Sequence, residues 1–348
     1  MSDSEEAAVR LRDVVFSYVR DATLPDSEAL TGEADPDERA GPVLRGVDMS
    51  VPDGSFTVVM GASGGGKSTL LRTFNAIIPD FIDGSFRGEV DVLGVDATET
   101  RVSEMARDVG MVLQDYESQL FGTSVEAEVA FGPENLAVPP AEIEPRIEQS
   151  LSIVGLDDLE LHREPSGLSG GQKQRLVFAG VAATHPELLV LDEPTSDLDP
   201  KGTRDIVDVV NTLSAGDAAG GDWSGPDTIA MVTHKIEEAL LADHAVLLKD
   251  GKPYRSGTVR EVFTDTDALA AARVAVPRWW RRSTNSAGPR TTYRCCPRKP
   301  GNGSKPPTWR TRRQPISAWL RAEPARTLAT RCSSFQTCAS PTRPTAGR

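Results

Sequence analysis

A glycine-rich loop carries the first residues that could do chemistry. The segment Gly61-Ala-Ser-Gly-Gly-Gly-Lys67-Ser68-Thr69 matches the pattern Gly-x-x-x-x-Gly-Lys-Ser/Thr. Glycines allow conformations that point successive backbone N–H groups to one side, where they can hold phosphate oxygens. Lys67 could then reach the outer phosphates of a nucleotide, and the Ser68 hydroxyl could join a Mg²⁺ shell. We therefore predict a phosphate site made of Gly61, Ala62, Ser63, Gly64, Gly65, Gly66, Lys67, Ser68 and Thr69.

Two adjacent carboxylates follow an apolar run later in the chain. Leu188–Leu191 is typical of a buried strand, and Asp192 and Glu193 stand at its end. Ligands of parallel α/β sheets bind at the carboxyl ends of the strands. Asp192 is then placed to hold Mg²⁺, directly or through water, and Glu193 to orient or deprotonate an attacking water. The alternative is an ordinary charged strand end.

Two more side chains stand at the ends of predicted strands. Thr228–Thr233 is apolar and ends on His234, for which we predict a contact with the terminal phosphate rather than a structural role. Tyr18 ends the alternating run that begins at Val9. It could pack at a sheet edge or stack on a nucleotide base, and the other motifs favour the base.

A second anion-binding helix start is predicted at Leu168–Arg175, which reads Leu-Ser-Gly-Gly-Gln-Lys-Gln-Arg. Ser169 suits a helix N-cap, and Gly170 and Gly171 before Gln172 leave backbone N–H groups open to an anion. The alternative is an ordinary capped helix.

The elements that must position these residues follow from periodicity and turn residues. The motif requires a strand before the glycine loop and a helix after it, and we predict them at Ser55–Met60 and Leu70–Ala76. A helical block runs from Ser124 to about Ala183, with breaks predicted at Pro133, Pro139 and Pro140. The other predicted strands are Val9–Tyr18, Val43–Val51, Gly88–Gly94, Val109–Gln114 and the hairpin Ala245–Ser256, and the other helices are Lys201–Leu213 and Thr258–Val274.

Charge divides the chain into two parts. Residues 278–348 hold 16 Lys and Arg against the single acid Glu323, so the rest holds 22 basic and 50 acidic side chains, a net charge of −28. So acidic a body resembles proteins adapted to high salt and argues against nucleic acid as its partner. An ordinary acidic cytosolic protein is the alternative. We expect residues 1–8 to be disordered, 21–42 to form an acidic loop, and 9–274 to form the functional domain.

The segment 275–348 is basic, rich in Arg, Pro, Ser and Thr, and holds all four cysteines. It is either a disordered arm that binds anionic lipid or nucleic acid, or a frame-shifted reading of GC-rich DNA, which we favour. The N-terminus is acidic and lacks an apolar core, so we expect no signal peptide, and no apolar run is long enough to cross a bilayer. We therefore expect any membrane role to be exerted from the cytoplasmic side through a partner.

The order of these motifs resembles that of ABC-type ATPases from about Val9 to Val274. The resemblance implies an α/β fold: a P-loop, RecA-like core with an antiparallel β subdomain and an inserted helical subdomain, here about 115–183. It also implies ATP and Mg²⁺ as ligands, with Gln114 at the nucleotide and the metal and Asp199 at the nucleotide. Two nucleotides would lie between two such subunits, with Ser169–Gln172 of one closing over the ATP held by Lys67 of the other.

The segment Gln114–Gly122 and the residues Val125–Leu136 look like those of energy-coupling-factor ATPases, although Asp115 replaces the usual Asn. These power uptake of vitamins or of cobalt and nickel ions. The resemblance implies a peripheral subunit at the cytoplasmic face of the membrane, with a transmembrane subunit docked near Gln114–Phe121. A second ATPase subunit and a substrate-capturing membrane protein complete the assembly. The alternatives are a translation or DNA-repair ATPase, or the ATPase of another transporter class.

Overall fold

A computed structural model of the chain describes residues 7–20, 24, 41–216 and 223–275. All of these residues belong to one structural unit. The predicted tail and most of the predicted acidic loop lie outside the described residues. The first strand begins at Ala7, two residues before the predicted start at Val9.

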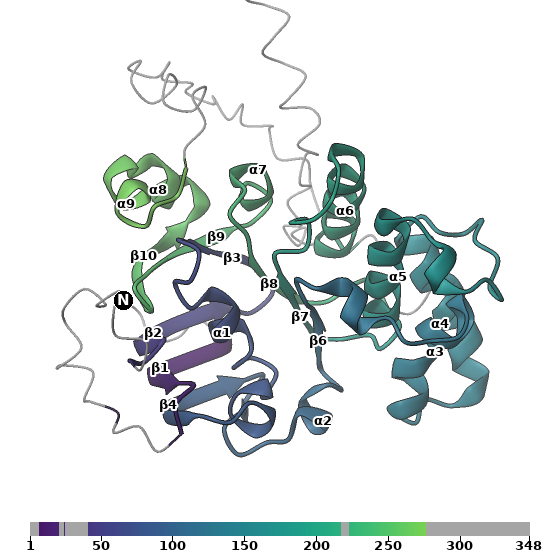
Figure 1. The fold of residues 1–348 in the computed structure, drawn as a ribbon, viewed down its shortest axis with the longest axis horizontal. Coiled ribbons are helices and arrows are strands. Elements are labelled where there is room, and N and C mark those ends of the chain that lie inside the picture. Colours follow the sequence, from purple (N-terminus) through teal and green to yellow (C-terminus); the bar gives the residue numbers. More distant parts are fainter. Residues whose placement is uncertain (1–6, 21–23, 25–40, 217–222, 276–348) are drawn as a thin grey trace, which may run out of the picture. The chain divides into compact units, whose positions relative to one another are not determined.

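A parallel sheet forms the centre of the unit (Figure 1). The described part of the chain places six strands in it, in the order β10-β9-β3-β8-β7-β6, and only β10 runs antiparallel to its neighbour. β3, β7 and β8 are buried at every residue, as expected for strands covered on both faces. The strands are β3 (Phe56–Gly61), β6 (Val109–Val112), β7 (Leu188–Asp192), β8 (Thr228–Val232), β9 (His244–Lys249) and β10 (Lys252–Thr258).

A smaller antiparallel sheet packs beside it. Its order within the described residues is β2-β1-β4-β5, with every pair antiparallel. Val9, Phe16 and Val47 of this sheet belong to the same buried cluster as Val59 and Val190 of the parallel sheet. The two sheets therefore share one core. The strands are β1 (Ala7–Ser17), β2 (Leu44–Pro52), β4 (Ser85–Val92) and β5 (Val95–Asp96).

The helix after the glycine loop differs from its prediction. α1 spans Lys67–Leu71, so it begins earlier and ends sooner than the predicted Leu70–Ala76. Turns follow it, then a short π-helix at Ile77–Phe81. Phe74 and Ala76 are fully buried in the turns, and Ala76 has a φ of 60°, which no right-handed helix allows. The apolar pattern therefore marked burial rather than helix.

Three helices form the block that the sequence predicts, and they pack on one another (Figure 1): α3 (Val125–Asn135), α4 (Pro140–Ile153) and α5 (Gly170–Ala182). α4 begins at Pro140, so the predicted break at Pro139 and Pro140 is confirmed. The break predicted at Pro133 is wrong, because α3 continues through it. A proline within a helix loses its own N–H hydrogen bond and crowds the carbonyl group four residues earlier, but burial of Val125 and Val129 holds α3 in place.

The remaining helices are α2 (Val102–Met105), α6 (Pro200–Ser214), α7 (Ile236–Ala239), α8 (Val259–Thr264) and α9 (Thr266–Ala271), with 3₁₀ turns at Tyr116–Gln119 and Pro165–Gly167. The single helix predicted at Thr258–Val274 is two helices. Asp265 divides them, and its carboxylate accepts a hydrogen bond from the Ala268 N–H at 2.9 Å, which caps α9. No helix among the described residues is long and apolar enough to cross a bilayer.

Candidate functional site

The glycine-rich loop runs from the end of β3 to the start of α1. Gly64 and Gly66 have φ values of 75° and 90°, in the left-handed region that favours glycine. A Cβ atom on Gly66 would also lie 3.0 Å from the carbonyl oxygen of Val43. No acceptor among the described residues meets the N–H groups of Gly64 and Gly66. The loop therefore keeps donors free, as a phosphate cradle requires.

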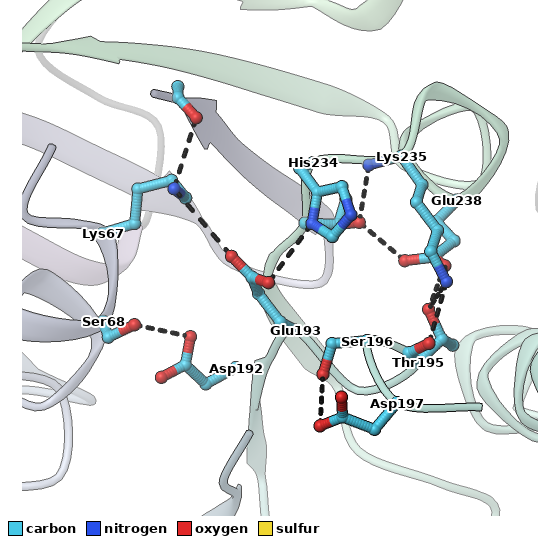
Figure 2. Close-up of polar contacts among 12 residues, drawn as sticks. Lys67, Ser68, Asp192, Glu193, Thr195, Ser196, Asp197, His234, Lys235 and Glu238 are labelled. Atoms are coloured by element: carbon cyan, nitrogen blue, oxygen red, sulfur yellow. Dashed lines mark hydrogen bonds and ion pairs between the residues drawn. The ribbon is translucent and has the colours of Figure 1, made fainter. Parts of the chain in front are cut away.

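Lys67 lies between the loop and the end of β7 (Figure 2). Its ammonium group donates to the carbonyl oxygens of Gly61 at 3.2 Å and Ala62 at 3.0 Å, and lies 3.9 Å from Oε1 of Glu193. The lysine is only 6% exposed. The fold thus places the Lys67 ammonium group between the glycine-rich loop and the end of β7, the two elements for which the sequence predicts phosphate contacts.

Ser68 and Asp192 meet across the same space. The Ser68 hydroxyl donates to Oδ1 of Asp192 at 2.9 Å (Figure 2). Burial raises the pKa of Asp192 above its usual value, while the hydrogen bond from Ser68 opposes this shift. A hydroxyl and a carboxylate in contact are oxygen ligands of the kind that Mg²⁺ takes.

A cavity of about 530 Å³ opens beside Asp192, and Gln114 and Arg72 also line it. Mg²⁺ sites at phosphates commonly use only one or two protein ligands, with water and phosphate oxygens completing the shell. The described residues contain no group of three or more His, Cys, Asp and Glu that could hold a metal alone. Ser68, Asp192 and Gln114 therefore fit a Mg²⁺ ion bound together with a phosphate.

Glu193 contacts His234 on the other side of the site. Oε2 of Glu193 lies 3.2 Å from Nδ1 of His234, and the His234 side chain is 56% exposed (Figure 2). Glu193 has a φ of 45°, a conformation that is uncommon outside glycine and recurs at functional sites. Its N–H donates to the carbonyl oxygen of Val232, which fixes the turn against β8. The carboxylate therefore faces both Lys67 and His234.

Tyr18 lies beside the glycine loop. Its hydroxyl is 2.9 Å from the Thr69 hydroxyl, and its ring meets Phe16 edge to face at 4.9 Å. The side chain remains 44% exposed. Tyr18 is therefore held next to the phosphate loop and stays accessible.

Comparison with known proteins identifies the family. A sequence model of the ABC transporter family matches residues 44–196. The chain is 41% identical over 237 residues to the energy-coupling factor transporter ATP-binding protein EcfA1 of Symbiobacterium thermophilum, covering 67% of this chain and 77% of that protein. It is 35% identical to the corresponding protein of Bacillus subtilis, covering 79% and 86%. This chain belongs to the ABC transporter ATPase family.

Other ABC transporter relatives are longer. The chain is 42% identical to an ABC transporter ATP-binding protein of Caldanaerobacter subterraneus and 39% identical to one of Methanosarcina mazei. It spans about two fifths of the length of each of these relatives, 42% of the first and 39% of the second. The matches cover 70% and 73% of this chain.

Solved structures show the same ABC fold. One is cbiO1 of Clostridium perfringens, part of the ABC transporter complex cbiONQ, with 27% identity, a TM-score of 0.60, and coverage of 80% of this chain and 99% of that one. A dimeric ATP-binding cassette bound to ADP and phosphate is 24% identical, with a TM-score of 0.57 and coverage of 72% and 99%. The latter supports the fold alone.

The ABC segment Ser169–Gln172 lies at the start of α5. The Ser169 hydroxyl accepts from the Gln172 N–H at 3.3 Å, and the Gln172 side chain accepts from the Ser169 N–H at 3.0 Å. None of the hydrogen bonds between described residues joins this segment to Lys67 or Ser68. Asp199 likewise caps α6, accepting from the Gly202 N–H at 2.7 Å.

Sequence reasoning missed four residues beside this ABC site: Thr195, Thr233, Lys235 and Glu238. They form a hydrogen-bonded group between the segment after Glu193 and the segment around His234. The apolar spacing of Ile236 and Ala239 predicts an inner face for this segment, but it does not single out Glu238.

Proposed function

We propose that this chain binds ATP with Mg²⁺ and hydrolyses the terminal phosphate bond. The observation that carries the proposal is the meeting of three segments far apart in sequence: the phosphate loop, the end of β7 and the end of β8. Ser68 contacts Asp192 at 2.9 Å, and Glu193 stands 3.9 Å from Lys67 and 3.2 Å from His234. Each of these contacts joins the phosphate loop or the end of β8 to the end of β7.

The positions of the side chains suggest their roles in the reaction. The Glu193 carboxylate orients the attacking water and accepts its proton. Lys67 and His234, on either side of Glu193, stabilise the negative charge that develops on the terminal phosphate. Tyr18 offers its accessible ring to the base. Ser68, Asp192 and Gln114 would hold Mg²⁺, which supplies positive charge between the phosphates.

We infer further that the active form is a dimer. Ser169–Gln172 presents a capped helix start that, among the described residues, forms no hydrogen bond to Lys67 or Ser68 of its own chain, so it is suited to complete a site on a second ATPase subunit. Asp199, at the start of α6, would lie near the same nucleotide.

The relatives named as energy-coupling factor transporter proteins support a role in an importer of a vitamin or metal ion. We propose that the subunit sits at the cytoplasmic face of the membrane, with a transmembrane subunit docked near Gln114–Phe121. A substrate-capturing membrane protein would complete the complex. Recovery of two such membrane proteins with this chain from detergent-solubilised membranes would support the proposal, whereas recovery of ribosomal or repair proteins alone would contradict it.

A Glu193→Gln variant tests the hydrolysis itself. It should keep ATP binding and lose turnover by at least about a hundredfold, because the amide cannot accept a proton from water. Equilibrium binding of a fluorescent ATP analogue and steady-state phosphate release measure the two properties. Lys67→Ala should instead weaken ATP binding. Glu187→Gln, an exposed acid just before β7, is the matched control and should behave as wild type. Normal turnover by Glu193→Gln would disprove its role as base.

A further inference from the structure

Glu238 is a buried carboxylate to which the proposed mechanism gives no role. It lies in the short helix α7 and is 2% exposed. Its Oε1 accepts a hydrogen bond from the Thr195 hydroxyl, and its Oε2 accepts one from the Thr233 hydroxyl at 2.6 Å. Thr195 is two residues after Glu193, and Thr233 immediately precedes His234. One carboxylate thus ties together the two segments that carry the Glu193–His234 contact.

Lys235 fixes the direction of these hydrogen bonds. Its backbone N–H donates to the Thr233 hydroxyl at 3.0 Å, and its ammonium group donates to the Thr195 hydroxyl at 2.8 Å. A lysine can only donate and an ionised carboxylate can only accept. Each threonine hydroxyl therefore accepts from Lys235 and directs its single proton at Glu238. Figure 2 shows the group beside His234.

The group is closed and well compensated. The ammonium of Lys235 also donates to the carbonyl oxygen of Thr195 at 2.8 Å and lies 3.4 Å from Oε1 of Glu238. Thr195 and Thr233 are 2% and 1% exposed. A buried charge is costly unless it is paired and hydrogen-bonded, and here both requirements are met. From the other side, the buried Gln174 amide of α5 donates to the carbonyl oxygen of Pro194. The backbone after Glu193 is therefore held on two sides.

We propose that Glu238 is a positioning residue for ATP hydrolysis. It holds the segment after Glu193 against the segment before His234, so that His234 keeps its 3.2 Å contact with Glu193. In this role Glu238 acts through His234, because its carboxylate is taken up by Thr195, Thr233 and Lys235. This inference rests on the function proposed above.

The test compares two neighbouring acids in the full-length chain. In Glu238→Gln, an amide N–H replaces one acceptor and faces a hydroxyl proton, so one hydrogen bond is lost. We expect kcat to fall roughly tenfold, the effect of one charge-assisted hydrogen bond, with the KM for ATP changed less than about twofold. Glu237→Gln alters an exposed neighbour and should match wild type. A change in KM alone, or equal effects of both variants, would overturn the proposal.

The His234→Ala background separates positioning from general damage. If Glu238 acts through His234, Glu238→Gln should cause no further loss of the residual turnover once His234 is removed, because the two effects are coupled. An additional tenfold loss in that background would show that Glu238 acts independently of His234, and the inference would fail.

Hydrogen–deuterium exchange tests the group without relying on turnover. Glu238→Gln should raise amide exchange in residues 193–199 and 233–239 and leave that of α3 unchanged. A uniform rise over the chain would indicate a loss of stability instead and would overturn the positioning role. If the wild-type chain binds and hydrolyses no ATP, the proposed function fails, while the exchange data still decide whether Glu238 joins the two segments.

Discussion

At the end of β7, Asp192 is 1% exposed, and burial raises its pKa above the usual value. For an acid, a raised pKa means that the folded state favours the protonated form. The stabilising effect is complete at low pH and is lost as the pH rises through the folded pKa. At neutral pH the ionised Asp192 therefore destabilises the ligand-free protein, and a bound cation would offset this cost.

An Asp192→Asn variant should separate stability from function. Because the neutral amide is isosteric and its oxygen can still accept from Ser68, we expect Tm at pH 7 without Mg²⁺ to rise by roughly a few degrees. Mg²⁺-dependent turnover should fall at the same time. Thermal unfolding followed by circular dichroism measures the first effect. Asp197→Asn, an exposed neighbour, should leave Tm unchanged. A lower Tm for Asp192→Asn would contradict the argument.

For single residues, the sequence predicts a functional role where the neighbours along the chain define the chemistry. Lys67 and Ser68 share one loop, and Asp192 and Glu193 are adjacent, so spacing alone locates them. Glu238 could not be found in this way. It follows another acid, Glu237, on a four-residue helix, and only the packing of α7 shows which of the two is buried.

Among the elements, Glu128 connects α3 to the segment after Gln114. Its Oε2 accepts from the N–H groups of Phe121 at 3.0 Å and Gly122 at 2.6 Å, and the residue is 7% exposed. Phe121 and Phe131 then meet on the surface at 4.3 Å. One buried carboxylate therefore fixes the segment that we propose as the docking region.

Removing this carboxylate should be costly. Glu128→Ala leaves two backbone N–H groups without an acceptor, and we expect about 1–3 kcal/mol of destabilisation. Glu134→Ala, at an exposed position of the same helix, should change stability by less than about 0.5 kcal/mol. Urea denaturation of both variants measures the difference. Equal midpoints would show that Glu128 does not hold the segment.

The turn between α5 and β7 contains a pH-sensitive side chain. His185 stacks on Trp223 with ring centres 4.9 Å apart, and its Nε2 is buried without a hydrogen-bond partner among the described residues. Burial, and secondarily the positive charge of Arg146, lower the pKa of His185 to about 4. Folding therefore favours the neutral ring, so stability should be full above the ordinary pKa of 6.5 and decrease as the pH falls toward about 4.

A His185→Asn variant tests this linkage. Asparagine cannot titrate in this range and tolerates the positive φ of 57° at this position. Between pH 7 and pH 5 the urea midpoint of the wild type should decrease, in part because of His185. We expect that part of the decrease to be absent in the variant. His162→Asn, at a side chain that is 85% exposed, should keep the wild-type pH dependence. An unchanged dependence in His185→Asn would contradict the assignment.

The sequence predicts strands better than helix ends. Burial on both faces of a sheet imposes an apolar pattern on a strand, whereas helix ends depend on tertiary packing and on single capping side chains. β3, β7 and β8 are continuous apolar runs, and burial on both faces requires just that. The residues from Leu70 to Ala76 show a similar pattern, but tertiary packing rather than helical period explains it. Likewise, a capping side chain, Asp265, divides α8 from α9 without interrupting the apolar pattern.

Over the whole molecule, charge is unevenly distributed. Residues 1–277 carry a net charge of −28, and the full chain carries −13. Like charges repel within a compact unit, and salt screens exposed charges over about 8–10 Å at moderate ionic strength. The high-salt adaptation predicted from composition remains a prediction.

Salt should therefore stabilise the protein, and more so without residues 278–348. Truncation after Pro277 removes the basic segment and leaves the acidic body, so we expect a steeper rise of Tm between 0.1 and 1 M KCl than for the full chain, by roughly a few degrees. Differential scanning calorimetry at matched protein concentrations measures both slopes. Equal slopes would show that repulsion between the acidic side chains of residues 1–277 does not lower the stability of the protein.

The pairing of β1 with β2 offers a route to a sensor. Phe16 lies opposite Leu44, and the Val43 N–H donates to the Phe16 carbonyl oxygen at 2.7 Å, so the two ends of the intervening connection are fixed side by side. Doubling the length of a flexible connection costs only about 0.6 kcal/mol. A fluorescent domain inserted in the connection between these two strands would therefore be joined to the protein at two fixed, neighbouring strand ends, and we expect its emission to change when a nucleotide binds near Tyr18.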